Sequence, residues 1–386
     1  MKYNIENNNL TIYLAGSVDS NNAEAVGKEL EDIRNAQPLG SLVLDLEDLK
    51  YISSAGLRQL LRLKKREKDL KVINVSSEIY DIFEMTGFSE MMDVQKAYRK
   101  FSVDGCEVIG EGSNGIVYRI NPDTIIKVYK NPDALEDIKK ERELARTALV
   151  LGINTAIPYD VVKVGDKYGS VFELLSAKSL TKLITEKPDS IEEYVHIFID
   201  LLKEIHSTSV KENLLPDAKQ RAIKWCEDLK GQIPDEIYNK IYEMLKAVPD
   251  KNTMIHGDYH TNNVHYQNGE AILIDMDTLS VGNPVFELSS IYLAYHGFGE
   301  LNHDAVSKFL KLDWDLAQKV MELSFKYYFE GKDEKDIIDN INKAKVVGYT
   351  RLLRRTLKRE KDNAVFIEHL KKRLIESVNS VDNLTI

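Results

Sequence analysis

The chain has 386 residues, which is too long for one ordinary compact core and long enough for a domain of about 100 residues joined to a two-lobed enzyme. Its formal net charge of −10 argues against nucleic acid or an anionic membrane as a partner, because both recruit positively charged surfaces. Two cysteines are too few for a disulfide framework or a zinc cluster, and neither a signal peptide nor a run of about 18 apolar residues is present, so we expect a cytoplasmic protein.

The first block of the chain, residues 1–100, alternates predicted strands with predicted helices. Short apolar runs typical of strands occur at 10–14, 41–46 and 71–75. Between them, residues 22–34 and 56–68 carry apolar side chains at helical spacing. This alternation predicts an α/β domain, with a mixed or parallel sheet covered by helices.

The rest of the chain divides into a β-rich part and a helical part. Residues 101–176 predict two strands around a Gly-rich turn, a third strand, a helix over 134–151 and two more strands. Residues 177–386 predict mainly amphipathic helices, interrupted by a hairpin that turns at Asn268 and Gly269. We therefore expect three units: 1–100, 101–176 and 177–386.

The Gly-rich turn has the pattern G-x-G-x-x-G-x-V, with Gly110, Gly112 and Gly115 at the glycine positions and Ser113 between them. Glycines let backbone N–H groups approach phosphate oxygens without interference from a Cβ atom. A Rossmann turn has the same spacing, but there the third glycine opens a helix. Here β-branched residues follow Gly115, so the pattern favours a hairpin that covers a nucleotide.

Lys127 lies in an apolar predicted strand and needs an acidic partner. The following helix offers Glu141 and Glu143, and Glu141 shares a face with Ala145 and Ala148, which favours it as the partner. The alternative is that Lys127 is an ordinary edge-strand lysine and both glutamates are surface charges.

The strongest motif is His-Gly-Asp-Tyr-His-Thr-Asn-Asn at 256–263, which is followed by Asp275 and Asp277 at the end of an apolar strand. Phosphoryl transfer needs a base that orients the acceptor, and oxygen ligands that hold Mg²⁺ on the phosphates. Asp258 can be the base, and Asn263 and Asp275 can be ligands. A zinc or two-metal hydrolase is the alternative, but it would not need the upstream Gly-rich hairpin and its lysine.

With these motifs, the region from residue 105 to 386 resembles the aminoglycoside phosphotransferase and choline kinase family, whose members are relatives of protein kinases. The resemblance implies an α+β bilobal protein-kinase-like fold, with 101–176 as the N-lobe and 177–386 as the C-lobe. It also implies that the protein uses ATP and Mg²⁺.

By this resemblance, Asp258 is the catalytic base, and Lys127 with Glu141 positions the phosphates. The metal ligands would be Asn263, Asp275 and Asp277. The other nucleotide-binding positions lie in the Gly-rich turn and in the hinge that meets the adenine through its backbone: Gly110, Gly112, Ser113, Gly115, Glu173 and Leu175.

The acceptor is predicted to be a small-molecule alcohol or amine. Asp277 is followed almost at once by Gly282 and Pro284, which leaves no room for a long peptide-docking segment. These residues resemble the family's G-x-P…D-L stretch, with Glu287 in place of the usual aspartate at a position that we interpret as structural. A basic stripe on a later helix is interpreted as a solvated face, with an anion-binding site as the alternative; it consists of Arg351, Arg354, Arg355, Lys358 and Arg359.

Residues 51–57, Tyr-Ile-Ser-Ser-Ala-Gly-Leu, resemble the signature of STAS domains, the fold of anti-sigma-factor antagonists. The resemblance covers residues 1–100 and implies a regulatory domain that binds a protein partner. It also implies that Ser54 can be phosphorylated, and a phosphate there would meet the N–H groups of a helix N-terminus. The alternative is that Ser53 or Ser54 only caps the helix.

Two other functions remain open. The chain could be a protein serine kinase that acts on a STAS serine, or a nucleotide-dependent regulatory switch in anti-sigma-factor signalling.

Overall fold

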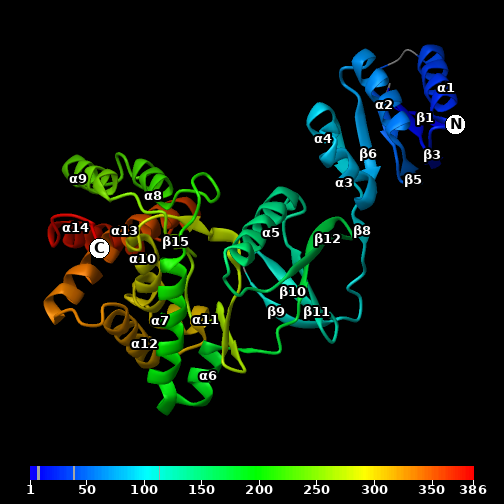
Figure 1. Ribbon diagram of the computed structural model, residues 1–386. Helices are drawn as coiled ribbons and strands as arrows, with labels where there is room; N and C mark the ends of the chain where they lie inside the picture. Colours follow the sequence, from blue (N-terminus) through cyan, green and yellow to red (C-terminus); the bar gives the residue numbers. More distant parts are fainter. Residues whose placement is uncertain (7–8, 38–39, 113) are drawn as a thin grey trace. The chain divides into compact units, whose positions relative to one another are not determined.

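The structure is a computed structural model that describes residues 1–6, 9–37, 40–112 and 114–386 (Figure 1). Contacts divide the chain into two compact units, here called the N-terminal unit (residues 1–102 with 161–166) and the C-terminal unit (residues 103–160 with 167–386). Among the described residues, no helix has both the length and the apolar character needed to cross a membrane.

The N-terminal unit is an α/β domain built on a five-stranded sheet in the order β1-β2-β4-β6-β7. The edge strand β1 is antiparallel to β2, and the other neighbours are parallel. Leu10, Ile12 and Leu44 are fully buried and lie at alternating strand positions, so one face of the sheet is covered by helices. The strands are β1 Lys2–Glu6, β2 Asn9–Tyr13, β3 Gly16–Val18, β4 Leu42–Asp45, β5 Leu49–Ile52, β6 Lys71–Val75 and β7 Asp93–Lys96, and the helices are α1 Ala23–Ala36, α2 Ser54–Arg66, α3 Ser77–Met85 and α4 Phe88–Met91.

The β-rich lobe of the C-terminal unit is formed by four neighbouring strands, in the order β13-β11-β10-β9, and by helix α5 (Leu135–Val150). Strands β9, β10 and β11 are successive antiparallel neighbours, so the Gly-rich turn joins two strands as expected. The strands of this lobe are β9 Glu107–Glu111, β10 Gly115–Asn121, β11 Thr124–Tyr129 and β13 Lys167–Glu173. Strand β8 (Arg99–Lys100) and most of strand β12 (Pro158–Val164) belong to the N-terminal unit.

The remaining part of the C-terminal unit is helical, with a short three-stranded sheet, β14-β16-β17, and a strand pair, β15-β18, that carry the loops of the candidate site. The helices are α6 Leu180–Glu186, α7 Ile191–Ser207, α8 Ala218–Glu227, α9 Asp235–Ala247, α10 Val285–Tyr295, α11 Asp304–Leu310, α12 Trp314–Tyr328, α13 Glu334–Arg359 and α14 Ala364–Asn379. The strands are β14 Lys178–Ser179, β15 Met254–Ile255, β16 Val264–Gln267, β17 Glu270–Leu273 and β18 Ser280–Val281.

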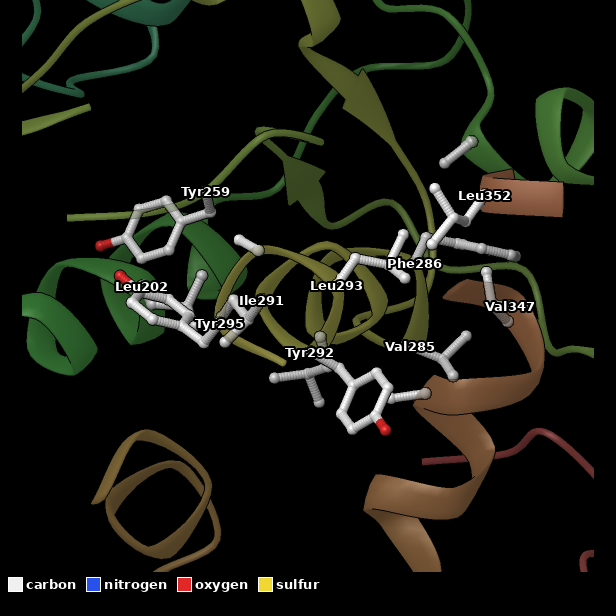
Figure 2. Close-up of a cluster of buried hydrophobic side chains, with 14 of the residues drawn as sticks. Leu202, Tyr259, Val285, Phe286, Ile291, Tyr292, Leu293, Tyr295, Val347 and Leu352 are labelled. Carbon is white, nitrogen blue, oxygen red and sulfur yellow. The ribbon is translucent and has the colours of Figure 1, made fainter. Parts of the chain in front are cut away.

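Helix α10 is the centre of this lobe, because every one of its residues is buried. Figure 2 shows its side chains between Leu202 and Tyr259 on one side and Val347 and Leu352 of α13 on the other. A helix that is apolar on all sides needs neighbours all round. Helix α10 therefore joins the loop that contains Tyr259 to helix α13.

The α/β domain and the α+β two-lobed fold predicted from the sequence are both confirmed. The predicted helix at 56–68 begins two residues earlier, because Ser53 caps it by accepting a hydrogen bond from the N–H of Gly56. Four strands and two helices among β1 to β7 and α1 to α4 lack a strong local pattern and were not predicted: β1, β3, β5, β7, α3 and α4.

Candidate active site

Lys127 lies in the middle of strand β11, where it pairs with Val117 on one side and Ser170 on the other. Its ammonium is 2.8 Å from a carboxylate oxygen of Glu141 on α5 and 3.2 Å from a carboxylate oxygen of Asp275. Burial by itself would lower the pKa of Lys127, but the two carboxylates outweigh it and raise the pKa above its usual range. The lysine is therefore a fixed positive charge.

Glu141 is the acidic partner, and it is buried, whereas Glu143 is exposed. Its second carboxylate oxygen accepts a hydrogen bond from the hydroxyl of Tyr129. Burial and the nearby Glu141 charge raise the pKa of Tyr129, so its hydroxyl remains a donor. Sequence reasoning missed Tyr129, although its position two residues after Lys127 on a strand puts both side chains on one face of the sheet.

The loop that carries Asp258 is held by hydrogen bonds on both sides. The Nε2 atom of His256 lies 3.1 Å from the carbonyl oxygen of Ile274, and its Nδ1 atom lies 3.4 Å from the backbone nitrogen of Asp258. Because both ring nitrogens have partners inside the protein, His256 positions the loop. This arrangement does not favour the zinc alternative.

Gly257 needs to be a glycine. Its φ is +84°, and a Cβ atom would lie 2.8 Å from the carbonyl oxygen of Thr278. The same carbonyl accepts a hydrogen bond from Arg221 of α8, which also donates to the hydroxyl of Ser280. Arg221 was not identified from the sequence, because nothing near it in the chain indicates its distant partners.

Glu287, in the first turn of α10, holds the loop that carries Asp258. Its side chain is fully buried, and its carboxylate accepts hydrogen bonds from the backbone nitrogens of His256 at 2.5 Å and Gly257 at 2.9 Å. The hydroxyl of Ser290 donates to it as well, at 3.0 Å. Glu287 therefore has a structural role: its carboxylate fixes the backbone of the two residues before Asp258.

Asn263 links the loop that carries Asp258 to the segment between strand β17 and Asp275. Its side-chain amide donates to the carbonyl oxygen of Asp258 at 3.0 Å, and its own carbonyl accepts from the backbone nitrogen of Ile274 at 2.9 Å. Asp275 follows in the left-handed region with φ of +65°, a conformation that costs energy for a residue other than glycine. The structure thus brings Asp258, Asn263 and Asp275 together, as the sequence predicted.

Asp277 lies close to Asp275 and Glu141, and the pKa of its carboxyl group is raised. Burial, followed by the charges of Asp275 and Glu141, raises the pKa of the Asp277 carboxyl to about 7. Asp277 and Glu141 also line a cavity of about 360 Å³ together with Asn114 and Tyr129. Crowded carboxylates of this kind are stabilised by a cation.

Asp258 has the opposite electrostatic environment. Burial would raise its pKa, but the ring of His260, 3.7 Å away, and the charges of Arg351 and His256 hold the pKa at about 2. The Asp258 carboxylate is therefore ionised throughout the physiological range. Arg351 also donates to the carbonyl oxygen of Gly257 at 2.8 Å, so the prediction that the basic stripe is wholly a solvated face is wrong for this residue.

The Gly-rich turn is closed by a hydrogen bond from the nitrogen of Gly112 to the carbonyl of Gly115 at 3.0 Å. A Cβ atom would lie 2.6 Å from a strand carbonyl at Gly115, but would meet nothing within 4 Å at Gly112 and would make ordinary contact at Gly110. The third glycine is thus required by the hairpin itself. Ser113, also predicted to bind nucleotide, lies outside the described residues.

The predicted hinge begins at the end of strand β13. Glu173 is the last residue of β13, and Leu175 lies in the connection from β13 to β14 and the helical lobe. The backbone nitrogens of Glu173 and Leu174 bond to the carbonyls of Ile157 and Asp123. In the N-terminal unit, Ser54 is exposed at the first position of α2, directly after the capping Ser53.

The site joins a β-rich lobe, which supplies Lys127 and Glu141, to a helical lobe that supplies three aspartates, Asp258, Asp275 and Asp277. This arrangement defines a phosphotransferase with the protein-kinase-like fold. Comparison with known proteins agrees. The chain belongs to the phosphotransferase enzyme family, which residues 105–316 match, and residues 1–101 match the STAS domain.

Individual relatives fall into two groups. Anti-sigma-B factor antagonists of Listeria monocytogenes and Listeria innocua are each 26% identical over 94 residues, which are 23% of this chain and 82% of theirs. A thermostable mutant of aminoglycoside phosphotransferase APH(4)-Ia, solved as a ternary complex with AMP-PNP and hygromycin B, matches with a TM-score of 0.50. It is 12% identical, and the match covers 72% of this chain and 93% of that one, a likeness that shows the fold.

Proposed function

We propose that this phosphotransferase moves the γ-phosphoryl group of ATP to a hydroxyl or amine of a small molecule, and that its STAS domain regulates the reaction. Residues 1–100 would be the regulatory domain, 101–176 the N-lobe and 177–386 the C-lobe. The observation that carries the proposal is an ionised Asp258, joined through Asn263 to Asp275, which in turn contacts the charged Lys127.

The nucleotide side of the site is the β-rich lobe. Lys127 stays charged because two carboxylates surround it, and it can neutralise phosphate oxygens while Glu141 and Tyr129 fix its position. Backbone N–H groups of the Gly-rich turn, from Gly110 through Ser113 to Gly115, would approach the phosphates. The backbone from Glu173 to Leu175 would contact the adenine.

The donor set fits Mg²⁺. Within the described chain, no three carboxylate, imidazole or thiolate groups converge closely enough to hold a metal by themselves. Mg²⁺ usually takes one or two carboxylates and fills its other positions with water and substrate phosphates. Asp275 and Asp277, with the carboxamide of Asn263, would supply such a partial set, and the ion would neutralise charge that develops on the phosphates.

Asp258 would accept a hydrogen bond from the acceptor hydroxyl and orient its oxygen toward the γ-phosphorus. As the new oxygen–phosphorus bond forms and the bond to the β-phosphate oxygen breaks, the proton passes to Asp258 and ADP leaves. Since a carboxyl group with a pKa near 2 is a weak base, positioning contributes more than proton affinity, and proton transfer comes late.

A small acceptor is supported by the segment that follows Asp277. Residues 276–284 form a short 3-10 turn and strand β18, which pairs with β15, and α10 begins at Val285. No part of this segment is left to dock a peptide. The chain would work in the cytoplasm, where ATP is available.

Regulation would act through a protein partner of the STAS domain. The exposed Ser54 is the candidate phosphorylation site, because a phosphate at the first residue of α2 would face the free N–H groups and the positive end of the helix dipole. Ser53 performs the capping role, so Ser54 is free of it.

Labelled ATP tests these assignments. The purified chain is incubated with a panel of alcohols and amines, and the label is followed on small molecules and on protein. We expect label on a small molecule, and we expect Asp258→Asn to abolish transfer while ATP binding by calorimetry persists. Label on Ser54 without labelled metabolite would show a protein kinase, and Ser54→Ala is the control. Full turnover by Asp258→Asn would remove Asp258 from its role.

A further inference from the structure

Helix α13 carries two neighbouring groups of cations that differ in their partners. Arg354 and Lys358 both bind the carboxylate of Asp228, at 2.7 and 2.6 Å. Arg351, Arg355 and Arg359 are spaced four residues apart, so they share another face of the helix. In the part of the chain that the structure describes, no carboxylate lies within ion-pair distance of these three arginines.

This arginine face, defined as Arg351, Arg355 and Arg359, begins beside the candidate base. Arg351 donates to the carbonyl oxygen of Gly257, the residue before Asp258. The guanidinium of Arg355 lies 5.6 Å from the ring centre of Phe298, and the charge of Asp258 acts on it. The face therefore leads away from Asp258 along the helix.

The three guanidinium groups repel one another. Partial desolvation of the Arg355 guanidinium, then the charges of Arg359 and Arg351, lower the pKa of Arg355. Like charges four residues apart weaken a helix. Arg355 and Arg359 are nevertheless exposed, so an incoming ligand can reach both. A negatively charged ligand would relieve this repulsion.

Aromatic side chains complete the surroundings. Phe309 is 40% exposed and packs edge-on against Phe298 and His260, with ring centres 5.7 and 5.0 Å apart. His260 is the neighbour of Asp258. Apolar rings therefore lie next to both the base and the arginine face, where they can contact the carbon skeleton of an acceptor.

We propose that the arginine face binds an anionic group of the acceptor, so that the substrates are alcohols or amines that already carry a phosphate or a carboxylate. The inference rests on the proposed function, because it assumes that the acceptor hydroxyl lies at Asp258. Arg355 follows Arg351 by one helical turn, about 6 Å along the axis. The anion would therefore be separated from the reacting oxygen by the length of a small sugar or polyol.

The first experiment measures anion binding without catalysis. The melting temperature of the full chain is recorded in inorganic phosphate and in sodium chloride of equal ionic strength. We expect phosphate to stabilise the wild type, and Arg355→Ala and Arg359→Ala to weaken its apparent affinity about tenfold, the loss expected for one charge-assisted hydrogen bond. Any stabilisation by phosphate bound near Lys127 should be the same in all variants, so it does not contribute to the differences between them.

Lys358→Ala is the matched control, since it removes the same charge from the same helix on the face paired with Asp228. It should keep the phosphate response. An equal loss in Lys358→Ala, or no specific phosphate effect in the wild type, would overturn the anion site.

The second experiment compares acceptors in pairs that differ in one charge, such as ribose with ribose 5-phosphate and glycerol with glycerol 3-phosphate, alongside the cationic hygromycin B. Transfer to the anionic members is expected, with the KM for the acceptor raised about tenfold in Arg355→Ala and a smaller change in kcat. Equal transfer to neutral or cationic members would refute the proposal. If phosphate binding needs Arg355 but no acceptor is labelled, the anion site stands and the proposed function fails.

Discussion

Glu287 provides a sharp test of how the site is built, because one buried carboxylate holds the loop that carries Asp258. Its oxygens accept from the backbone nitrogens of His256 and Gly257 and from the hydroxyl of Ser290. Replacing it with alanine leaves two buried N–H groups without an acceptor and opens a cavity. Replacing it with glutamine keeps the shape, removes the charge and replaces one of the two acceptor oxygens with an NH2 group.

The expected cost follows from these contacts. Each buried N–H group that loses its acceptor costs about 1–3 kcal/mol, so Glu287→Ala should lose about 4 kcal/mol in the free energy of unfolding. A hydrogen bond to a charged group is worth about 1 kcal/mol more than a neutral one, so Glu287→Gln should lose about 1–2 kcal/mol. Against a total stability of about 5–15 kcal/mol, both changes are measurable.

Urea unfolding and steady-state kinetics are the assays, and Glu212→Ala, which removes an exposed carboxylate, is the control. Displacement of Asp258 by about 1 Å should lower kcat about 100-fold. The KM for ATP should change little, since Lys127 and Glu141 lie in the other lobe. If Glu287→Ala unfolds within about 0.5 kcal/mol of the wild type, or loses ATP affinity instead of kcat, the anchoring role of Glu287 is refuted.

Three further predictions follow from the geometry of the site. Gly115→Ala should destabilise the β-rich lobe by about 1–3 kcal/mol, whereas Gly112→Ala, where a Cβ atom has open space, should be neutral in the same thermal unfolding experiment. Because the pKa of Asp277 is raised to about 7, the stability that its protonated form contributes is fully present below pH 3.8 and is lost as the pH rises through 7. Mg²⁺ competes with that proton, so the Mg²⁺ affinity read from melting temperatures should be about tenfold weaker at pH 6 than at pH 8. An Mg²⁺ affinity that does not change with pH would contradict the assignment of Asp277 as a ligand. Tyr129→Phe removes a donor from buried Glu141 and should cost about 1–2 kcal/mol in urea unfolding, with no change expected if the hydroxyl contact is incidental.

The parts of the site that could be predicted from the sequence are those with a local pattern. Lys127 lies in an apolar strand, and Glu141 shares a helix face with small apolar residues. The spacing from Asp258 to Asn263 fits one loop, and a hairpin brings Asp275 back beside it. The structure confirms these placements because short-range geometry determined each of them.

The residues that could not be predicted act across long distances in the chain. Arg221 bonds to residues near 280, and Glu287 bonds to residues near 256, so their roles depend on how helices pack. Arg351 was grouped with its basic neighbours because charge spacing alone does not distinguish the solvent side of a helix from the side that faces the loop of Asp258. Tyr129 could have been found, since it is two positions from Lys127 on a strand.

The buried helix α10 explains why the base and the arginine face can work together. Its glutamate holds the loop of Asp258, and its apolar side chains pack against α13, where Val347 and Leu352 are buried (Figure 2). The packed core therefore sets the distance between the candidate base and the arginines of α13, because close-packed interiors deform little. A site built on such a frame selects acceptors by length as well as by charge, since the hydroxyl and the anion must reach two points whose separation does not change.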